Sequence, residues 1–203
     1  MARPQTRSDQ AIIQATRTVL MERGPSASIS AIAKKARLSG PAILGRFGSR
    51  AALVQAALAP PPLAPVLAAL HLEPSTDEFP AQLERLLSVM GAWYEQALPS
   101  QVLLRLSAPS QRPLPANARA HQPRIQPTLT IWLAKAQARE LVVRGDPQAL
   151  SATILHALRG HATQAMLEGG RSNTAALATV VQQLASLTLR PHSPFDYDAP
   201  VRR

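Results

Sequence analysis

The stretch from Ser28 to Phe47 constrains the fold more than any other part of the chain, because its pattern is that of two short helices joined by a tight turn. Apolar residues recur at helical spacing behind Ser28, which caps the first helix; Ser39 caps the second, with Pro41 in its first turn. The second segment is too short and too poor in apolar residues to be held by core burial. A short helix that is supported by its neighbours and exposes small side chains is typical of a helix-turn-helix, which enters the major groove of DNA.

Charge is distributed unevenly along the chain. Residues 1–50 hold nine lysines and arginines against Asp9 and Glu22, a net charge of +7, whereas the remainder holds 13 basic and 10 acidic residues, a net charge of +3. A small basic region attached to a nearly balanced remainder is typical of a nucleic-acid-binding protein, because phosphate neutralisation supplies most of the affinity. A solvated basic surface explains the charge equally well, so the helix-turn-helix spacing is what favours double-stranded DNA as the partner.

From Ala11 to Leu53 the chain resembles the tetracycline-repressor-like (TetR) regulators. The resemblance rests on the apolar residues and Gly24 of a first helix, on the two helix-turn-helix segments, and on Ser49 and Arg50 at the start of a fourth helix. It implies a homodimeric transcriptional regulator, a ligand-responsive repressor of a palindromic operator. It also implies an effector pocket in the helical body, whose occupation changes the separation of the two DNA-binding heads and lowers their affinity for the operator.

The resemblance assigns the DNA contacts to the helix-turn-helix and the start of the fourth helix. Lys34, Lys35, Arg46 and Arg50 are expected to hold phosphates, and residues 40–44 to face the bases. The full expected set is Ser28, Lys34, Lys35, Ser39, Gly40, Pro41, Ala42, Leu44, Arg46 and Arg50.

Three positions depart from the family pattern. Arg37 stands where a glycine is usual, so a non-glycine residue is expected at positive φ, at about 1 kcal/mol. Leu44 stands where a tyrosine is usual, and Arg46 where an aromatic residue or histidine is common. With few hydrogen-bonding side chains near the bases, thymine methyl contacts or DNA shape would carry more of the specificity. The alternative is a helical dimer that binds a ligand or a protein partner with degenerate DNA recognition.

No segment alternates as a strand between hairpin turns, so the predicted fold class is all-α, with about nine helices. Prolines at 60–62 end the fourth helix and mark the clearest boundary. We expect four regions: a DNA-binding domain at 1–59, a proline-rich linker at 60–76, a helical effector-binding and dimerisation domain at 77–190, and a loose tail at 191–203.

Prolines also set the helix boundaries expected in the body. A helix starting at about Asp77 is predicted to break at Pro99, with a separate short segment from Gln101 to Ala108. A long helix is suggested over 116–144, starting or kinking at its internal prolines and ending at Gly145.

The resemblance implies that the effector pocket lies within this body. Residues that could line it are Trp93, Leu103, Leu106, Trp132, His156 and Arg159, although tryptophans on apolar faces are more often core residues. Scarce charge in the body favours a small apolar or neutral effector. Two apolar stripes near the end of the chain are explained either as core or, as the resemblance implies, as half of a four-helix dimer interface. They comprise Leu150, Ile154, Leu158, Ala162, Leu177, Val180, Val181, Leu184 and Leu187.

Other classes of protein have little support in the sequence, and we expect no enzyme, no metal site and no cofactor. His156 and His161 lie about 140° apart around a helix, so they do not share a face as a zinc-binding pair would. Neither a glycine-rich phosphate loop nor a serine elbow is present. With no apolar run of about 18 residues, no secretion signal and no cysteine, we expect a cytoplasmic protein.

Overall fold

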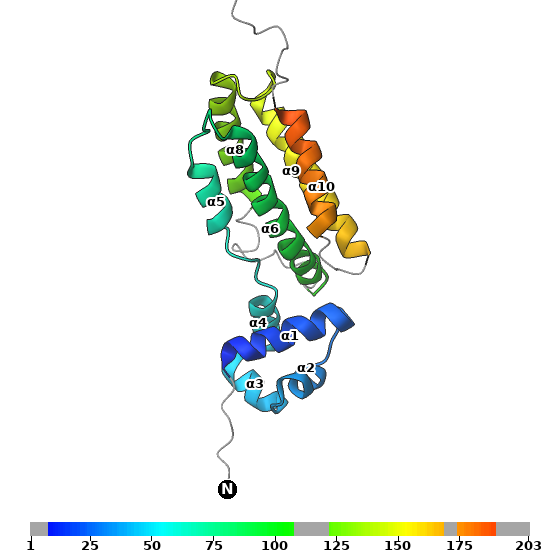
Figure 1. Ribbon diagram of the computed structural model, residues 1–203. Coiled ribbons are helices and arrows are strands. Elements are labelled where there is room, and N and C mark those ends of the chain that lie inside the picture. The colour runs from blue at the N-terminus through cyan, green and yellow to red at the C-terminus, as the bar shows by residue number, and fades with distance from the viewer. Residues whose placement is uncertain (1–7, 108–121, 169–173, 190–203) are drawn as a thin grey trace, which may run out of the picture.

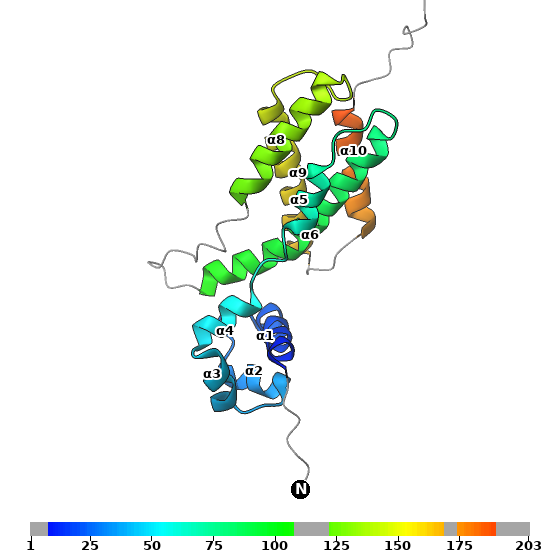
Figure 2. The same ribbon diagram turned by 90° about the vertical axis from the view of Figure 1, so that its left-hand side faces the viewer.

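The computed structural model describes residues 8–107, 122–168 and 174–189, and the regular elements in this part of the chain are nine helices. The predicted all-α fold is therefore confirmed. Four helices form a head at one end of the molecule and five form an elongated body (Figures 1 and 2). The head contains α1 (Asp9–Arg23), α2 (Ile29–Ala36), α3 (Gly40–Phe47) and α4 (Arg50–Ala57). The body contains α5 (Ala64–His71), α6 (Phe79–Ser107), α8 (Gln122–Ala138), α9 (Pro147–Leu167) and α10 (Thr174–Thr188).

Each head helix begins at a serine that caps it. The hydroxyl oxygens of Ser8, Ser28, Ser39 and Ser49 each accept a hydrogen bond from the backbone amide three residues further on, at 3.1–3.2 Å. A serine cap satisfies an amide that has no partner inside the helix, so these local signals fix where the short helices start. Behind the caps, the four helices bury one small core.

The turn between α2 and α3 contains the strained residue that the sequence predicts. Arg37 has φ 55° and ψ 45°, the left-handed conformation that glycine adopts without strain. The amide of the next residue, Leu38, donates to the carbonyl of Ala33 over 3.1 Å, which closes the end of α2. The turn therefore has the geometry of a glycine-type helix cap, with an arginine in the glycine position.

The segment at 60–76, expected as a linker, is mostly part of the body. It contains α5, whose Val66 and Leu70 are 0 % and 5 % exposed in the body core. The indole N–H groups of two body tryptophans hold its two ends: Trp93 donates to the Pro61 carbonyl (3.1 Å) and Trp132 to the Leu72 carbonyl (2.8 Å). Burial of a helix that is too short to be stable alone explains this correction to the linker prediction.

Helix α6 does not break at Pro99, and the separate segment predicted from Gln101 to Ala108 does not exist as such. One helix runs from Phe79 to Ser107 with the proline inside it. Ala97 before the proline and Leu104 after it are both buried, so apolar contacts continue on one face across the missing hydrogen bond. Ala97 packs in the body core and Leu104 in the head core, so α6 joins the two.

Helix α8 ends at Ala138, earlier than predicted. Glu140 has φ 58°, and the amide of Leu141 donates to the carbonyl of Ala136 (3.0 Å), so the chain turns out of the helix. Val142 then pairs with Leu189 in an isolated β-bridge. The predicted start of this helix at 116 lies outside the described residues, as does the predicted tail at 191–203.

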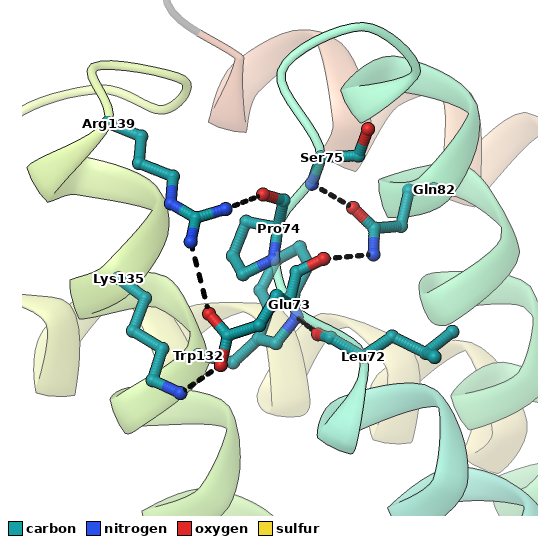
Figure 3. Close-up of polar contacts among 8 residues, drawn as sticks. All are labelled: Leu72, Glu73, Pro74, Ser75, Gln82, Trp132, Lys135 and Arg139. Atoms are coloured by element: carbon teal, nitrogen blue, oxygen red, sulfur yellow. Dashed lines mark hydrogen bonds and ion pairs between the residues drawn. The ribbon is translucent and has the colours of Figure 1, made fainter.

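The far end of the body is closed by a polar cluster around Glu73 (Figure 3). Its carboxylate pairs with Lys135 and with Arg139, which also donates to the Pro74 carbonyl. The hydrogen bond from Lys135 lowers the pKa of Glu73 from its ordinary value of 4.5, and both neighbouring cations contribute charge in the same direction. Gln82 of α6 binds the same segment from the other side, because its side chain contacts the backbone of Glu73 (2.9 Å) and Ser75 (2.8 Å).

Within the described residues, no helix combines the length and the apolar character needed to span a membrane.

Candidate nucleic-acid interface

Helices α2 and α3 lie at the end of the molecule that points away from the body (Figure 1). Ile43 is fully buried in the head core and anchors α3, and Leu44 is half-buried beside it. Pro41, Ala42 and Arg46 are exposed. The helix therefore presents a low, mostly uncharged surface, edged by one arginine, to the solvent.

Glycine at position 45 belongs to this exposed surface although the sequence interpretation did not include it among the DNA contacts. A Cβ atom added there would have no neighbour within 4 Å, so the fold does not require glycine. Gly40 differs, because its added Cβ would lie 3.9 Å from the Ile29 side chain. The spacing from Pro41 and Ala42 to Gly45 is one helical turn, and that period is the signal that could have identified it.

Basic side chains surround α3. Lys34 and Arg37 are exposed and make no side-chain hydrogen bond or ion pair within the described residues. Lys35 pairs with Glu22, and Arg46 with Asp9, both at 3.4 Å. Exposed pairs of this kind contribute about 0–1 kcal/mol, so a phosphate can readily replace either carboxylate. Arg37, absent from the predicted set, thus faces solvent beside the predicted lysines.

Arg50 is placed differently from the other predicted phosphate contacts. Its half-buried guanidinium donates to the carbonyl of Pro25 (2.6 Å) and to that of Ala27 (2.9 and 3.3 Å). These bonds hold the loop between α1 and α2, directly before the cap residue Ser28. Arg50 therefore positions the start of α2, and a direct phosphate contact by it stays a prediction.

Ser28 and Ser39, also in the predicted set, lie exposed at the N-termini of α2 and α3. The N-terminus of a helix attracts anions through its free amides and its dipole. Both sites are thus compatible with phosphate contacts.

The six residues expected to line an effector pocket do not come together. Trp93 and Trp132 are buried and hold the α5 segment by their indole groups, and Trp132 stacks on Phe79 with ring centroids 5.5 Å apart. The remaining four are separated: Leu103 packs against the head core, Leu106 and His156 are exposed, and Arg159 is half-buried. Tyr94 follows Trp93 in α6; burial raises the pKa of its hydroxyl, and the charge of Arg159 opposes that shift. The predicted pocket is therefore corrected: its tryptophans are core residues.

Most residues expected at a dimer interface are core residues of their own chain. Six of the nine are at most 8 % exposed: Ile154, Leu158, Ala162, Leu177, Val181 and Leu184. Leu150 and Val180 are half-buried, and only Leu187, at 74 %, is largely exposed. The apolar stripes of α9 and α10 face inward because α6 and α8 cover them. Of the two explanations of the stripes, this is the one in which they belong to the core of their own chain.

No group of three or more histidines or carboxylates that could hold a metal ion occurs among the described residues. The exposed, basic helix-turn-helix on an all-α body defines a regulator of the helix-turn-helix class. Comparison with known proteins shows which family the head resembles and which solved structures share the fold.

Residues 12–57 match the family described as bacterial regulatory proteins, tetR family. A TetR-family transcriptional regulator from Agrobacterium tumefaciens has the same fold with a TM-score of 0.65, at 17 % identity over 90 % of this chain and 97 % of that one. A TetR-like regulator from Rhodococcus sp. RHA1 has a TM-score of 0.59, at 21 % identity over 91 % and 97 %. A SmeT–triclosan complex has a TM-score of 0.58, at 12 % identity over 96 % and 99 %. No curated protein matches the sequence significantly.

The head therefore matches the tetR family of bacterial regulatory proteins, and the chain shares the fold of solved TetR-family regulators over nine-tenths of its length. Members of this family are DNA-binding proteins and are generally not enzymes.

Proposed function

We propose that this protein is a ligand-responsive repressor that binds a palindromic operator as a homodimer in the cytoplasm. The observation that carries the proposal is the exposed surface of α3 with basic residues around it. Pro41, Ala42 and Gly45 keep side chains short, so the backbone of α3 can approach the base edges closely. Lys34, Arg37 and Arg46 stand at the margin of this surface, where phosphates flank a helix in the major groove.

The outer faces of α9 and α10 support the homodimer. The exposed residues on these faces carry no Asp, Glu, Lys or Arg: Ala149, Thr153, His156, Gly160, Thr163 and Leu167 on α9, and Ala175, Thr179, Gln182 and Ser186 on α10. Helix α10 has no charged residue at all. Helices that face water usually carry charges, whereas interfaces are depleted in Lys, Glu and Asp. These faces, rather than the buried stripes, would form a four-helix contact with a second copy.

A dimer also suits the head. Two helix-turn-helix units must meet half-sites separated by a helical turn or more of DNA, so two-fold symmetry in the protein implies a palindromic operator. An effector that prefers one of two dimer shapes changes the separation of the heads and lowers operator affinity. The similarity in fold to SmeT, which binds triclosan in the complex, favours a small effector in the body.

The test is selection of bound fragments from random-sequence DNA by the purified protein at near-physiological salt. A recovered palindrome with half-sites spaced for a dimer supports the proposal and supplies the operator. A Lys34→Ala/Arg46→Ala variant should then bind that operator roughly 30-fold more weakly at 0.15 M salt, with the salt slope reduced by about 2.

The matched control is Arg85→Ala/Arg144→Ala, which removes the same charge from exposed side chains of the body. If both variants lost the same operator affinity, only net charge would matter, and a specific interface on the head would be contradicted. Recovery of no sequence, also after unfolding and refolding to remove a bound ligand, would instead favour the alternative of a dimer with degenerate DNA recognition.

A further inference from the structure

A pocket of about 260 Å³ lies between α6 and α9. Its walls are mostly small or apolar side chains, including Ala92 and Pro99 from α6 and Ala165 and Met166 from α9. None of the residues predicted to line an effector pocket contributes to it. The volume is below the roughly 300–1,000 Å³ typical of sites for drug-sized ligands, so it suits a compact molecule.

A buried polar pair contributes a carboxyl group to this otherwise apolar pocket. Glu95 lines the pocket, and its Oε1 lies 2.9 Å from Nε2 of His161 on α9. The two side chains are only 8 % and 10 % exposed, so the pair is held away from bulk water. A carboxylate can accept about four hydrogen bonds, so Glu95 has the capacity to accept a further one from a ligand while it binds the histidine.

The α6 wall of the pocket is also where the body touches the head. Gln96, which lines the pocket, accepts a hydrogen bond at its carbonyl from the guanidinium of Arg17 on α1 (3.2 Å). One turn further on, Pro99 interrupts the hydrogen-bond ladder of α6, the usual place for a helix to bend. Beyond it, Leu104 packs in the head core. A ligand against this wall therefore touches Gln96, whose carbonyl binds the head, and lies within two helical turns of Leu104 in the head core.

We propose that this pocket is the effector site of the regulator, and that it takes a compact, uncharged, cyclic apolar molecule with one hydrogen-bond donor. Glu95 accepts that donor, and Met166 packs on the ring, as thioethers do favourably with aromatic groups. A formally charged ligand fits less well, because Glu95, the charged residue among the described residues of the lining, is already engaged with His161. The effector role rests on the proposed DNA-binding function; the binding site itself does not.

Binding in this pocket is compatible with the proposed dimer. Of the α9 residues in the pocket wall, Ala162 and Ala165 lie roughly opposite Gly160 around the helix, whereas Met166 lies about 60° from Thr163, at the border of the outer face. A second copy on the outer face therefore leaves the walls formed by Ala162 and Ala165 unchanged.

The experiment uses indole as the probe, because it has an apolar ring system and one N–H, and indene as its isostere without the donor. The full-length protein is labelled at its methionine methyl carbons, and the four signals are assigned by Met→Leu replacement. Indole should shift the Met166 signal in a saturable way, and leave the signals of Met21, on the head, and Met90, in the body core, unchanged. Indene should bind about tenfold more weakly or worse, as loss of a hydrogen bond to a charged group implies.

Ala165→Phe places a ring in the pocket and should abolish the indole-induced shift. Its matched control is Ala134→Phe, at an exposed position of α8, which should bind indole as the wild type does. A Met166 signal that does not respond to indole overturns the site. Equal binding of indene overturns the role of Glu95 as acceptor, and unchanged binding by Ala165→Phe places the ligand elsewhere.

The effect of the ligand on DNA binding is tested separately, with the operator that the selection recovers. Saturating indole should weaken operator binding at least fivefold, the lower end of typical allosteric couplings. A shifted Met166 signal with unchanged operator affinity overturns the effector role and leaves the binding site standing. A shifted signal in a protein that binds no DNA refutes the proposed function itself, and the two failures are thus distinguishable.

Discussion

The head and the body are specified in different ways. Each head helix starts at a serine that bonds its own first turn, and three of the four are only eight residues long. In the body, α5 has no side-chain cap, and α6 and α8 continue through Pro99 and Pro127. The head is thus defined largely by local signals, and the body by packing between helices that are distant in sequence. Local signals fix a precise surface, whereas packing tolerates irregular helices and leaves room for a pocket.

The largest expected effect concerns packing between copies. Gly160→Leu adds a side chain to the outer face of α9, where even a Cβ has no neighbour within 4 Å in the chain itself. The protomer should fold, but the dimer should be lost, and operator affinity should fall about 10²–10⁴-fold as the link between the two heads disappears. Sedimentation should give a mass near 21.8 kDa rather than twice that value.

Ala134→Leu, an exposed position on α8, is the control for added apolar surface and should stay dimeric. A dimeric Gly160→Leu protein would place the interface elsewhere.

The second effect concerns Leu104, the buried residue that α6 contributes to the head core. Leu104→Ala removes the body's buried leucine from the head core and should destabilise the protein by about 2–5 kcal/mol, measured by urea unfolding. Hydrogen exchange in α1 and α4, the head helices that contact α6, should rise most. Leu106→Ala, two residues further along and 65 % exposed, should change stability by less than about 0.5 kcal/mol. Similar effects of the two changes would mean that α6 does not complete the head core.

A smaller effect tests the local signals. Ser39→Ala removes the cap of α3 and should cost about 1 kcal/mol, seen as faster amide exchange in α3 and a lower urea midpoint. Ser30→Ala is the control, because Ser30 is exposed in the first turn of α2 and caps no helix. If both variants behave alike, the capping serines do not define the head.

The smallest effect is expected at the polar cluster of the body. The folded-state pKa of Glu73 is lowered, so its ion pairs contribute stability above its unfolded pKa, near 4.5, and that contribution is lost as the pH falls through the folded value. Glu73→Gln should therefore lower the midpoint of thermal unfolding slightly at pH 7 and make no difference at the lowest pH. Glu84→Gln, at an exposed α6 residue without an ion pair among the described residues, should show no such pH dependence.

The sequence predicts the features that depend on local signals, and it does not predict those that depend on packing between distant segments. The serine caps and the positive φ at Arg37 are local, and the structure confirms them at the predicted residues. The continuation of α6 across Pro99 depends on Leu104 finding the head core, a contact between residues far apart in sequence. Single-residue propensities carry no information about that contact, so the sequence alone predicts a break at the proline.

The candidate sites also differ in how far local sequence signals predict them. Motif spacing predicts Lys34 and Arg46 beside α3 but does not include Arg37. It also does not foresee that Arg50 turns inward to the loop carbonyls of Pro25 and Ala27. The apolar stripes of α9 were predicted correctly as apolar, but apolarity does not tell whether a helix or a second chain covers them. Glu95 and His161 pair across 66 positions of the sequence, so no local signal indicates the contact.

The contact of Leu104 with the head has a consequence for how the chain is made. The ribosome releases the head first, yet the core of the head lacks one of its buried leucines until α6 has emerged, 46 residues after Leu58. At translation rates of about 5–20 residues per second, that delay is about 2–9 s. During that interval the newly made DNA-binding surface belongs to an unfinished domain. The core of the head is therefore complete only once α6, the helix that also lines the pocket, has been synthesised.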